Sequence, residues 1–261
     1  TVDVIATQRH FLGLGAPLSQ CRLTAADVDG VNGVNTVDVI GIQRFFLGYS
    51  TGIGNSGKYK FNPASRSYPA LTNDQSGQDY DALIFGDVST GFVYRPEGPP
   101  QTDAGDPYAV GKIGMVSLPN IVVETSIADI VAVVETSAIN PNDQLVGFQG
   151  DFSFDERVVT FQSEAVRKAG ITKGNWNVSG NVLPGAGPIR TLRISAYSID
   201  FTPLSGEGTL FELRMKKVSQ SSERTQLLWA PPPNQFIYID ADLRTQMPEY
   251  TASGSVVDFQ D

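Results

Sequence analysis

An acidic loop near the start of this chain of 261 residues carries the side chains best suited to chemistry. Its sequence, Asp27-Val-Asp-Gly-Val-Asn-Gly-Val-Asn-Thr-Val-Asp38, runs for twelve residues from acid to acid. Calcium is a hard cation that takes several oxygen ligands. A twelve-residue loop followed by a helix supplies them from positions 1, 3, 5, 7, 9 and 12. The spacing therefore predicts a calcium site.

The ligand positions of this loop are filled by oxygen-bearing groups with one exception. We expect the ligands to be the side chains of Asp27, Asp29, Asn35 and Asp38 and the backbone carbonyl of Gly33. Val31 stands at position 5 and offers no side-chain oxygen, so the missing ligand is water, Asn32 or absent. Asn32 occupies the turn position, and asparagine tolerates the left-handed conformation that this turn needs. A solvated acidic turn without metal is the alternative.

A duplicated segment positions this loop. The sequence of residues 1–13, TVDVIATQRHFLG, recurs at 36–48 as TVDVIGIQRFFLG, with ten of the thirteen positions identical. A repeat of this period indicates a duplicated supersecondary unit. Each copy is expected to form a short helix that ends at its glycine. In the second copy the expected packing face consists of Val39, Ile40, Ile42, Phe46 and Leu47.

The loop and its helix resemble the F-hand repeat of a type I-like dockerin, which normally occurs twice. Dockerins are non-catalytic modules that bind cohesins. The resemblance covers residues 1–50 and implies that the partner-binding residues are Thr36, Val37, Gln43 and Arg44, with Gln8 and Arg9 in the first copy. It also implies that Asp3 is the last acid of a first, truncated calcium loop, so the chain is expected to be a fragment of something longer.

The composition argues against several classes of partner. The net charge is −9, and the basic residues form no run or stripe, which argues against nucleic acid and anionic membrane surfaces. No apolar stretch approaches the roughly 18 residues of a membrane helix. The single cysteine, Cys21, is expected to be a packed small hydrophobe. Calcium loops of this kind favour an extracellular or cell-surface location, and Asn177 begins a glycosylation sequon.

Residues 51–108 are expected to form an extension rich in Tyr, Gly and Asp, followed by a Pro/Gly linker at 95–107. Residues 79–87 are the only strand-like piece. The acids of this region follow no loop spacing and are expected in exposed turns rather than in a further cation site; they are Asp74, Asp79, Asp81 and Asp87. The tyrosines are expected to pin the extension to its neighbours, and a sugar-stacking platform is the alternative.

Residues 109–261 change to short runs of alternating apolar and polar residues separated by turns, as at 148–154, 192–197 and 211–216. Period-two alternation in many short strands, without a helical block, favours an antiparallel sandwich. The predicted fold class is therefore mainly β, with a small α-helical F-hand module before a β-sandwich.

The β part also resembles a family. The run at 145–161, LVGFQGDFSFDERVVTF, resembles the cohesin pattern of a hydrophobic strand followed by Phe-Asp and a Val-rich strand. Segments at 174–178, 192–198, 204–210 and 254–257 agree with that pattern in order. The resemblance implies a nine-stranded jelly-roll sandwich whose flat sheet face receives a dockerin.

The chain contains none of the usual catalytic motifs, and we expect no enzyme activity. Asp151 and Asp155 could meet the carboxylate spacing of a glycosidase, but outward acids on a sandwich strand are usually a solvated face. We expect a non-catalytic, calcium-dependent extracellular scaffold protein. Its partner is a cohesin- or dockerin-type protein, and two copies of the chain joined head to tail would propagate into a filament. The alternatives are a carbohydrate-binding module that uses Trp176, Trp229 or tyrosines, and the anchoring tail of a larger secreted enzyme.

Overall fold

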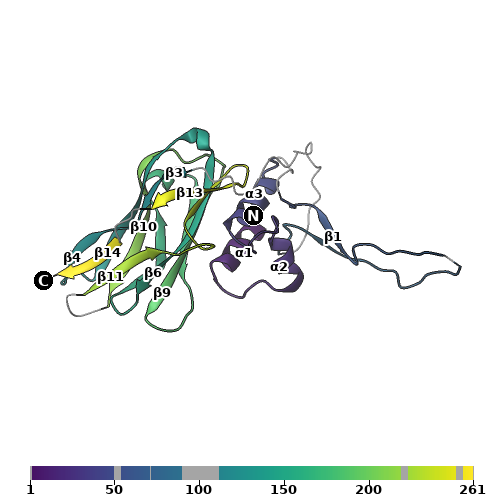
Figure 1. Ribbon diagram of the computed structural model, residues 1–261, viewed down its shortest axis with the longest axis horizontal. Helices are drawn as coiled ribbons and strands as arrows, with labels where there is room; N and C mark the ends of the chain where they lie inside the picture. The colour runs from purple at the N-terminus through teal and green to yellow at the C-terminus, as the bar shows by residue number, and fades with distance from the viewer. Residues whose placement is uncertain are drawn as a thin grey trace. The chain divides into compact units, whose positions relative to one another are not determined.

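The computed structural model describes residues 2–49, 54–70, 72–89, 112–218, 223–250 and 255–260. The chain divides into two compact units, residues 1–10 with 16–104 and residues 11–15 with 105–261. We call them the helical unit and the β-rich unit (Figure 1). The linker expected at 95–107 lies outside the described residues. None of the helices in the described part of the chain is long and apolar enough to span a membrane.

The helical unit contains α1 (Val2–Phe11), α2 (Gln20–Ala26) and α3 (Thr36–Phe46). The two copies of the repeat form α1 and α3, as their shared sequence predicts. Helix α3 begins with a reciprocal capping box between Asn35 and Asp38, and the left-handed φ of 76° at Gly48 follows its end. Helix α2 has only seven residues, too few for the sequence to show a helical period.

Two packing expectations for the helices were wrong. Val39, Ile40 and Ile42 are buried as expected, but Phe46 and Leu47 at the end of α3 are exposed. The apolar stripe therefore extends beyond the part of the helix that is covered. Cys21 is exposed rather than packed. The buried positions of α2 are Ala25 and Ala26 in its last turn, and Cys21 lies in its first.

The extension belongs to the same unit as the helices. It forms an antiparallel hairpin of β1 (Tyr59–Asn62) and β2 (Asp81–Ile84), which projects from the helices in Figure 1. The sequence analysis predicted β2 but not β1, a run of only four residues, Tyr-Lys-Phe-Asn, all of which are exposed. Aromatic contacts within the hairpin join its two strands. The Phe61 ring centroid lies 6.0 Å from that of Tyr59 and 6.4 Å from that of Tyr80.

The β-rich unit contains twelve strands in its described residues, where nine were expected. They are β3 (Lys112–Ser117), β4 (Ile121–Glu124), β5 (Asp129–Ile139), β6 (Leu145–Asp155), β7 (Val159–Lys168), β8 (Trp176–Val182), β9 (Ile189–Ser198), β10 (Gly206–Lys217), β11 (Arg224–Trp229), β12 (Ile237–Asp240), β13 (Thr245–Tyr250) and β14 (Ser255–Gln260). The larger number arises partly because Pro119, which lacks an amide hydrogen, separates β3 from β4.

The strands form two facing layers around an apolar core. Hydrogen bonding runs through β4, β14, β11, β6, β12, β13, β3, β5, β10 and β7. Strand β9 also pairs with β6, and β8 pairs with β9. The pairings are antiparallel except β13 with β3 and β14 with β4. Phe148 of β6 stacks on Phe211 of β10 with ring centroids 5.7 Å apart. Because β6 and β10 are not neighbours in the hydrogen-bonded order, this contact joins opposite layers. The mainly β fold class is confirmed.

Both tryptophans pack in this core. Trp176 is 4% exposed and stacks on Phe148 with ring centroids 5.9 Å apart. Trp229 meets Phe152 edge-on at 5.8 Å and packs against the core cluster. Both rings therefore serve packing, and neither is a free surface for stacking a sugar.

Gly150 on β6 tests how closely this core is packed. A Cβ added there would lie 2.7 Å from the Cα of Phe236. We predict that Gly150→Ala lowers the free energy of unfolding of the β-rich unit by about 1–3 kcal/mol, the usual cost of overpacking. Urea unfolding followed by tryptophan fluorescence measures this change. Gly174→Ala is the control, because nothing lies within 4 Å of its added Cβ. An equal loss in both variants would contradict the packing argument.

Candidate metal centre

The loop between α2 and α3 brings three carboxylates together. Asp27, Asp29 and Asp38 each place an oxygen so that these atoms lie within 4.8 Å of one another. Among the residues that the structure describes, this is the only group of three or more acids, histidines or cysteines that could hold a metal ion. Of the acids of the extension, Asp74 and Asp79 are exposed outside the strands, whereas Asp81 lies in β2 rather than in the expected turn and Asp87 is half-buried.

Backbone amides fold the first half of the loop around its acids. The Gly30 amide donates to Asp27 Oδ1 at 3.0 Å, and the Val31 amide donates to Asp29 Oδ1 at 2.8 Å. These are short-range turns of the kind that Asp favours. Asn32 adopts a left-handed φ of 59°, as the sequence predicts for an asparagine at the turn position.

Asp38 closes the loop from its other end. Its Oδ1 accepts the amides of Val28 at 2.7 Å and Asp29 at 3.2 Å, and its Oδ2 accepts the amide of Asn35 at 2.8 Å. Each carboxylate oxygen has two lone pairs. The two amides therefore use Oδ1 fully, and Oδ2 keeps one lone pair. While the loop stays closed, Asp38 can offer a cation one oxygen and not two.

Asn35 serves the helix and the loop rather than acting only as a ligand. Its Oδ1 accepts the Val37 amide at 2.8 Å, which caps α3, and its Nδ2 donates to the Gly33 carbonyl at 2.9 Å. A position-9 residue often reaches calcium through a water molecule, which this geometry allows. The Gly33 carbonyl retains a second lone pair for a cation.

The three carboxylates repel one another in a partly dry site. Burial, together with the charge of Asp27, raises the pKa of Asp29 to about 6. Burial and the charge of Asp29 raise the pKa of Asp38 well above its ordinary value. A divalent cation would remove this repulsion, and an all-oxygen donor set suits calcium. The residues present fit such an ion, although Val31 leaves the set one side-chain ligand short.

Asp3, the predicted acid of a first calcium loop, has a different environment. Its Oδ1 accepts the amides of Val88 at 2.9 Å and Ser89 at 2.8 Å, and the Ser89 hydroxyl at 2.7 Å. Burial acts to raise the pKa of Asp3, but these hydrogen bonds outweigh it and lower the pKa. The sequence reading missed Val88 and Ser89. The signal was present, because Asp87-Val88-Ser89 resembles Asp27-Val28-Asp29.

The six predicted partner-binding residues differ in exposure. Arg9 is exposed and Arg44 is half-buried. The remaining four are buried; they are Gln8, Thr36, Val37 and Gln43. Asn177 lies within strand β8, half-buried, where its Oδ1 accepts the Ser179 hydroxyl at 3.0 Å. Partner binding and glycosylation at these positions stay predictions.

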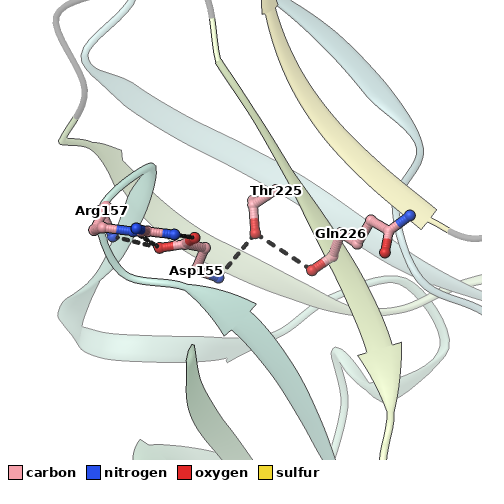
Figure 2. Close-up of polar contacts among 4 residues, drawn as sticks. All are labelled: Asp155, Arg157, Thr225 and Gln226. Carbon is pink, nitrogen blue, oxygen red and sulfur yellow. Dashed lines mark hydrogen bonds and ion pairs between the residues drawn. The ribbon is translucent and has the colours of Figure 1, made fainter. Parts of the chain in front are cut away.

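Asp151 and Asp155, the two candidate glycosidase carboxylates, each form an ion pair with an arginine. Arg193 donates to both oxygens of Asp151, at 2.9 and 2.8 Å. Figure 2 shows Asp155 at the end of β6, where Arg157 donates to both of its oxygens at 3.0 and 2.6 Å. These bonds from Arg157 lower the pKa of Asp155. A general acid needs the opposite shift. The Asp155 amide also donates to the Thr225 hydroxyl at 2.8 Å, which ties β6 to β11.

A scan of protein-family models and a search of curated proteins find no match to this chain. Solved cohesins are similar to part of it. The sixth cohesin of scaffoldin B from Acetivibrio cellulolyticus, solved with a dockerin, has 13% identity and a TM-score of 0.44, covering 57% of this chain and 100% of that one. A chain of a type I cohesin–dockerin complex from Clostridium thermocellum has 12% identity and a TM-score of 0.45, covering 57% of this chain and 100% of that one. A non-cellulosomal cohesin from Archaeoglobus fulgidus has 12% identity and a TM-score of 0.39, covering 58% of this chain and 93% of that one.

The raised pKa values of Asp29 and Asp38 predict how stability depends on pH. In chelator, the folded loop binds protons more readily than the unfolded chain. The melting temperature of the helical unit should therefore rise as the pH falls from about 7 to about 5. With calcium present the trend should reverse, because protons then compete with the cation. Thermal unfolding followed by circular dichroism at the helix band measures both trends, and the same trend in both buffers would contradict a cation site.

A second prediction concerns the ligand that Val31 lacks. Val31→Asp supplies the side-chain oxygen at position 5 and should tighten calcium binding by about tenfold or more, since ligand charge sets the affinity of such loops. Isothermal titration calorimetry measures the change. Ser76→Asp adds the same charge at an exposed position of the extension and is the control. Calcium binding that is no tighter in Val31→Asp than in this control would show that residue 31 does not face the ion.

Proposed function

We propose that this protein is a non-catalytic interaction protein in which calcium shapes the helical unit for binding a protein partner. The observation that carries the proposal is the convergence of Asp27, Asp29 and Asp38 at the start of α3. The same short loop caps that helix through Asn35, so an ion bound by the loop acts directly on the helix. Calcium would then set the position of α3 and of the predicted partner-binding residues on it.

The electrostatics of the loop explain why such binding would depend on calcium. Without a cation, the folded loop must hold three carboxylates close together, and the raised pKa values of Asp29 and Asp38 express that cost. A ligand that binds only the folded state stabilises it in proportion to the logarithm of its concentration. Calcium at concentrations typical outside cells would favour the ordered loop, which supports an extracellular or cell-surface role.

The β-rich unit supplies the second half of the proposal. Strands β8, β9 and β6 pair along their length into one continuous sheet, on which Arg193 and Asn181 already donate to the carbonyls of Phe11 and Leu12. We infer that this sheet receives a dockerin-type partner, either another protein or the helical unit of a second copy. Contact between unlike surfaces of two copies is heterologous and propagates into a filament unless its rotation closes a ring.

Self-assembly predicts a calcium-dependent size. The full chain should grow in mass with concentration in calcium and stay monomeric in chelator, as measured by light scattering after size-exclusion chromatography. Arg9→Glu reverses the charge of an exposed residue on α1 and should weaken the association about tenfold or more. Arg22→Glu, exposed on α2, is the matched control. A monomer at every concentration in calcium would exclude self-assembly and leave a different protein partner as the form of the proposal to test.

A carbohydrate-binding role is favoured by one observation, the exposed rings of the hairpin. Tyr59, Phe61 and Tyr80 are 45–53% exposed. Their contacts with one another also account for their presence; Trp176 is in the core and Trp229 packs against it. Retention on insoluble polysaccharide that is lost in Tyr80→Ala would support this second role.

A further inference from the structure

A short segment after the hairpin repeats the first half of the acidic loop. Residues 86–89, Gly-Asp-Val-Ser, follow β2, and residues 26–29, Ala-Asp-Val-Asp, begin the loop before α3. We call residues 86–89 the exit strap, because they follow the hairpin strand β2. The strap lies far along the chain from the helix that it contacts, so the duplication of residues 1–13 does not reveal it.

The exit strap contacts α1 as the loop contacts α3. Asp3 and Asp38 are equivalent in the two copies of the repeat. Asp38 Oδ1 accepts two successive amides, those of Val28 and Asp29. Asp3 Oδ1 likewise accepts two successive amides, those of Val88 and Ser89. In both places an aspartate in the first turn of a repeat helix therefore accepts the valine amide and the amide that follows it.

The surroundings of the two segments are also alike. Val28 is 0% exposed and Val88 is 1% exposed, so the middle residue of each segment is in the core. The Gly86 amide donates to the Ala25 carbonyl at 2.7 Å, which joins the start of the strap to the residue just before the loop segment. The two half-loops thus lie beside each other within the helical unit.

The residue in the third place of each segment distinguishes the two. Asp29 brings a carboxylate toward Asp38, and an acceptor cannot satisfy another acceptor. Ser89 instead donates its hydroxyl to Asp3 Oδ1 at 2.7 Å. The strap therefore closes on its aspartate with hydrogen bonds to a charged acceptor, which are among the stronger ones in proteins.

We propose that the exit strap is a displaced half-loop that locks the chain after the hairpin onto α1 through Asp3, by hydrogen bonds alone. When the strap is closed, the residues that follow β2 are fixed to the first turn of α1.

Hydrogen exchange of the full chain, read by mass spectrometry, tests the lock. In the wild type the amides of Val88 and Ser89 should be protected. Asp3→Ala should speed their exchange about ten- to a hundredfold, as the loss of hydrogen bonds to a charged group predicts. Ser89→Ala removes one donor and should give a smaller increase. If Asp3→Ala unfolds the helical unit, the exchange rates in Ser89→Ala still test the lock. Asp81→Ala, an exposed acid of β2, should leave residues 86–89 unchanged.

The result expected in chelator separates this inference from the proposed function. Protection of residues 86–89 should be the same with calcium and with chelator, whereas protection of residues 27–38 should fall in chelator if the loop binds the ion. Rapid exchange at 86–89 in the wild type would overturn the lock. So would protection at 86–89 that neither Asp3→Ala nor Ser89→Ala reduces, or that disappears in chelator. Loss of calcium dependence at 27–38 alone would overturn only the calcium proposal.

Discussion

The helical unit depends on one carboxylate that does two things at once. Asp38 accepts three backbone amides, which closes the loop and caps α3, and it does so in a buried position next to two other acids. The hydrogen bonds favour the charged form, whereas burial and like charges disfavour it. The raised pKa of Asp38 shows that the unfavourable effects are larger. A loop built in this way gains from any cation that fits between its acids.

The same geometry with a different neighbour has the opposite electrostatic result. Asp3 accepts two successive amides as Asp38 does, but the third group is the Ser89 hydroxyl and not a carboxylate. Its pKa is lowered, while that of Asp38 is raised. Burial is the largest cause of the raised pKa of Asp38, followed by the charge of Asp29. At the less buried Asp3, the hydrogen bonds from Ser89 and Val88 outweigh burial.

The β-rich unit is stabilised in a different way. Its core is aromatic, with Phe148 contacting Trp176, Phe211 and Phe236 at centroid distances of 5.6–5.9 Å. Its charged residues near the layers are paired within the unit, as Asp151 is with Arg193 and Asp155 with Arg157. Apolar packing and ion pairs within the unit therefore stabilise its two layers.

The sequence alone determined the features that arise from neighbouring residues. The repeat predicted α1 and α3, the spacing of acids predicted the cluster of Asp27, Asp29 and Asp38, and alternation predicted most strands of the sandwich. Such patterns are local because helix and strand periods, caps and twelve-residue loops are set by residues close in the chain. Tertiary structure decided the rest. Whether Phe46, Cys21 and Trp176 are covered depends on segments that pack against them from elsewhere. The partner of Asp3 lies on a segment that follows the hairpin, and only folding brings those two parts of the chain into contact.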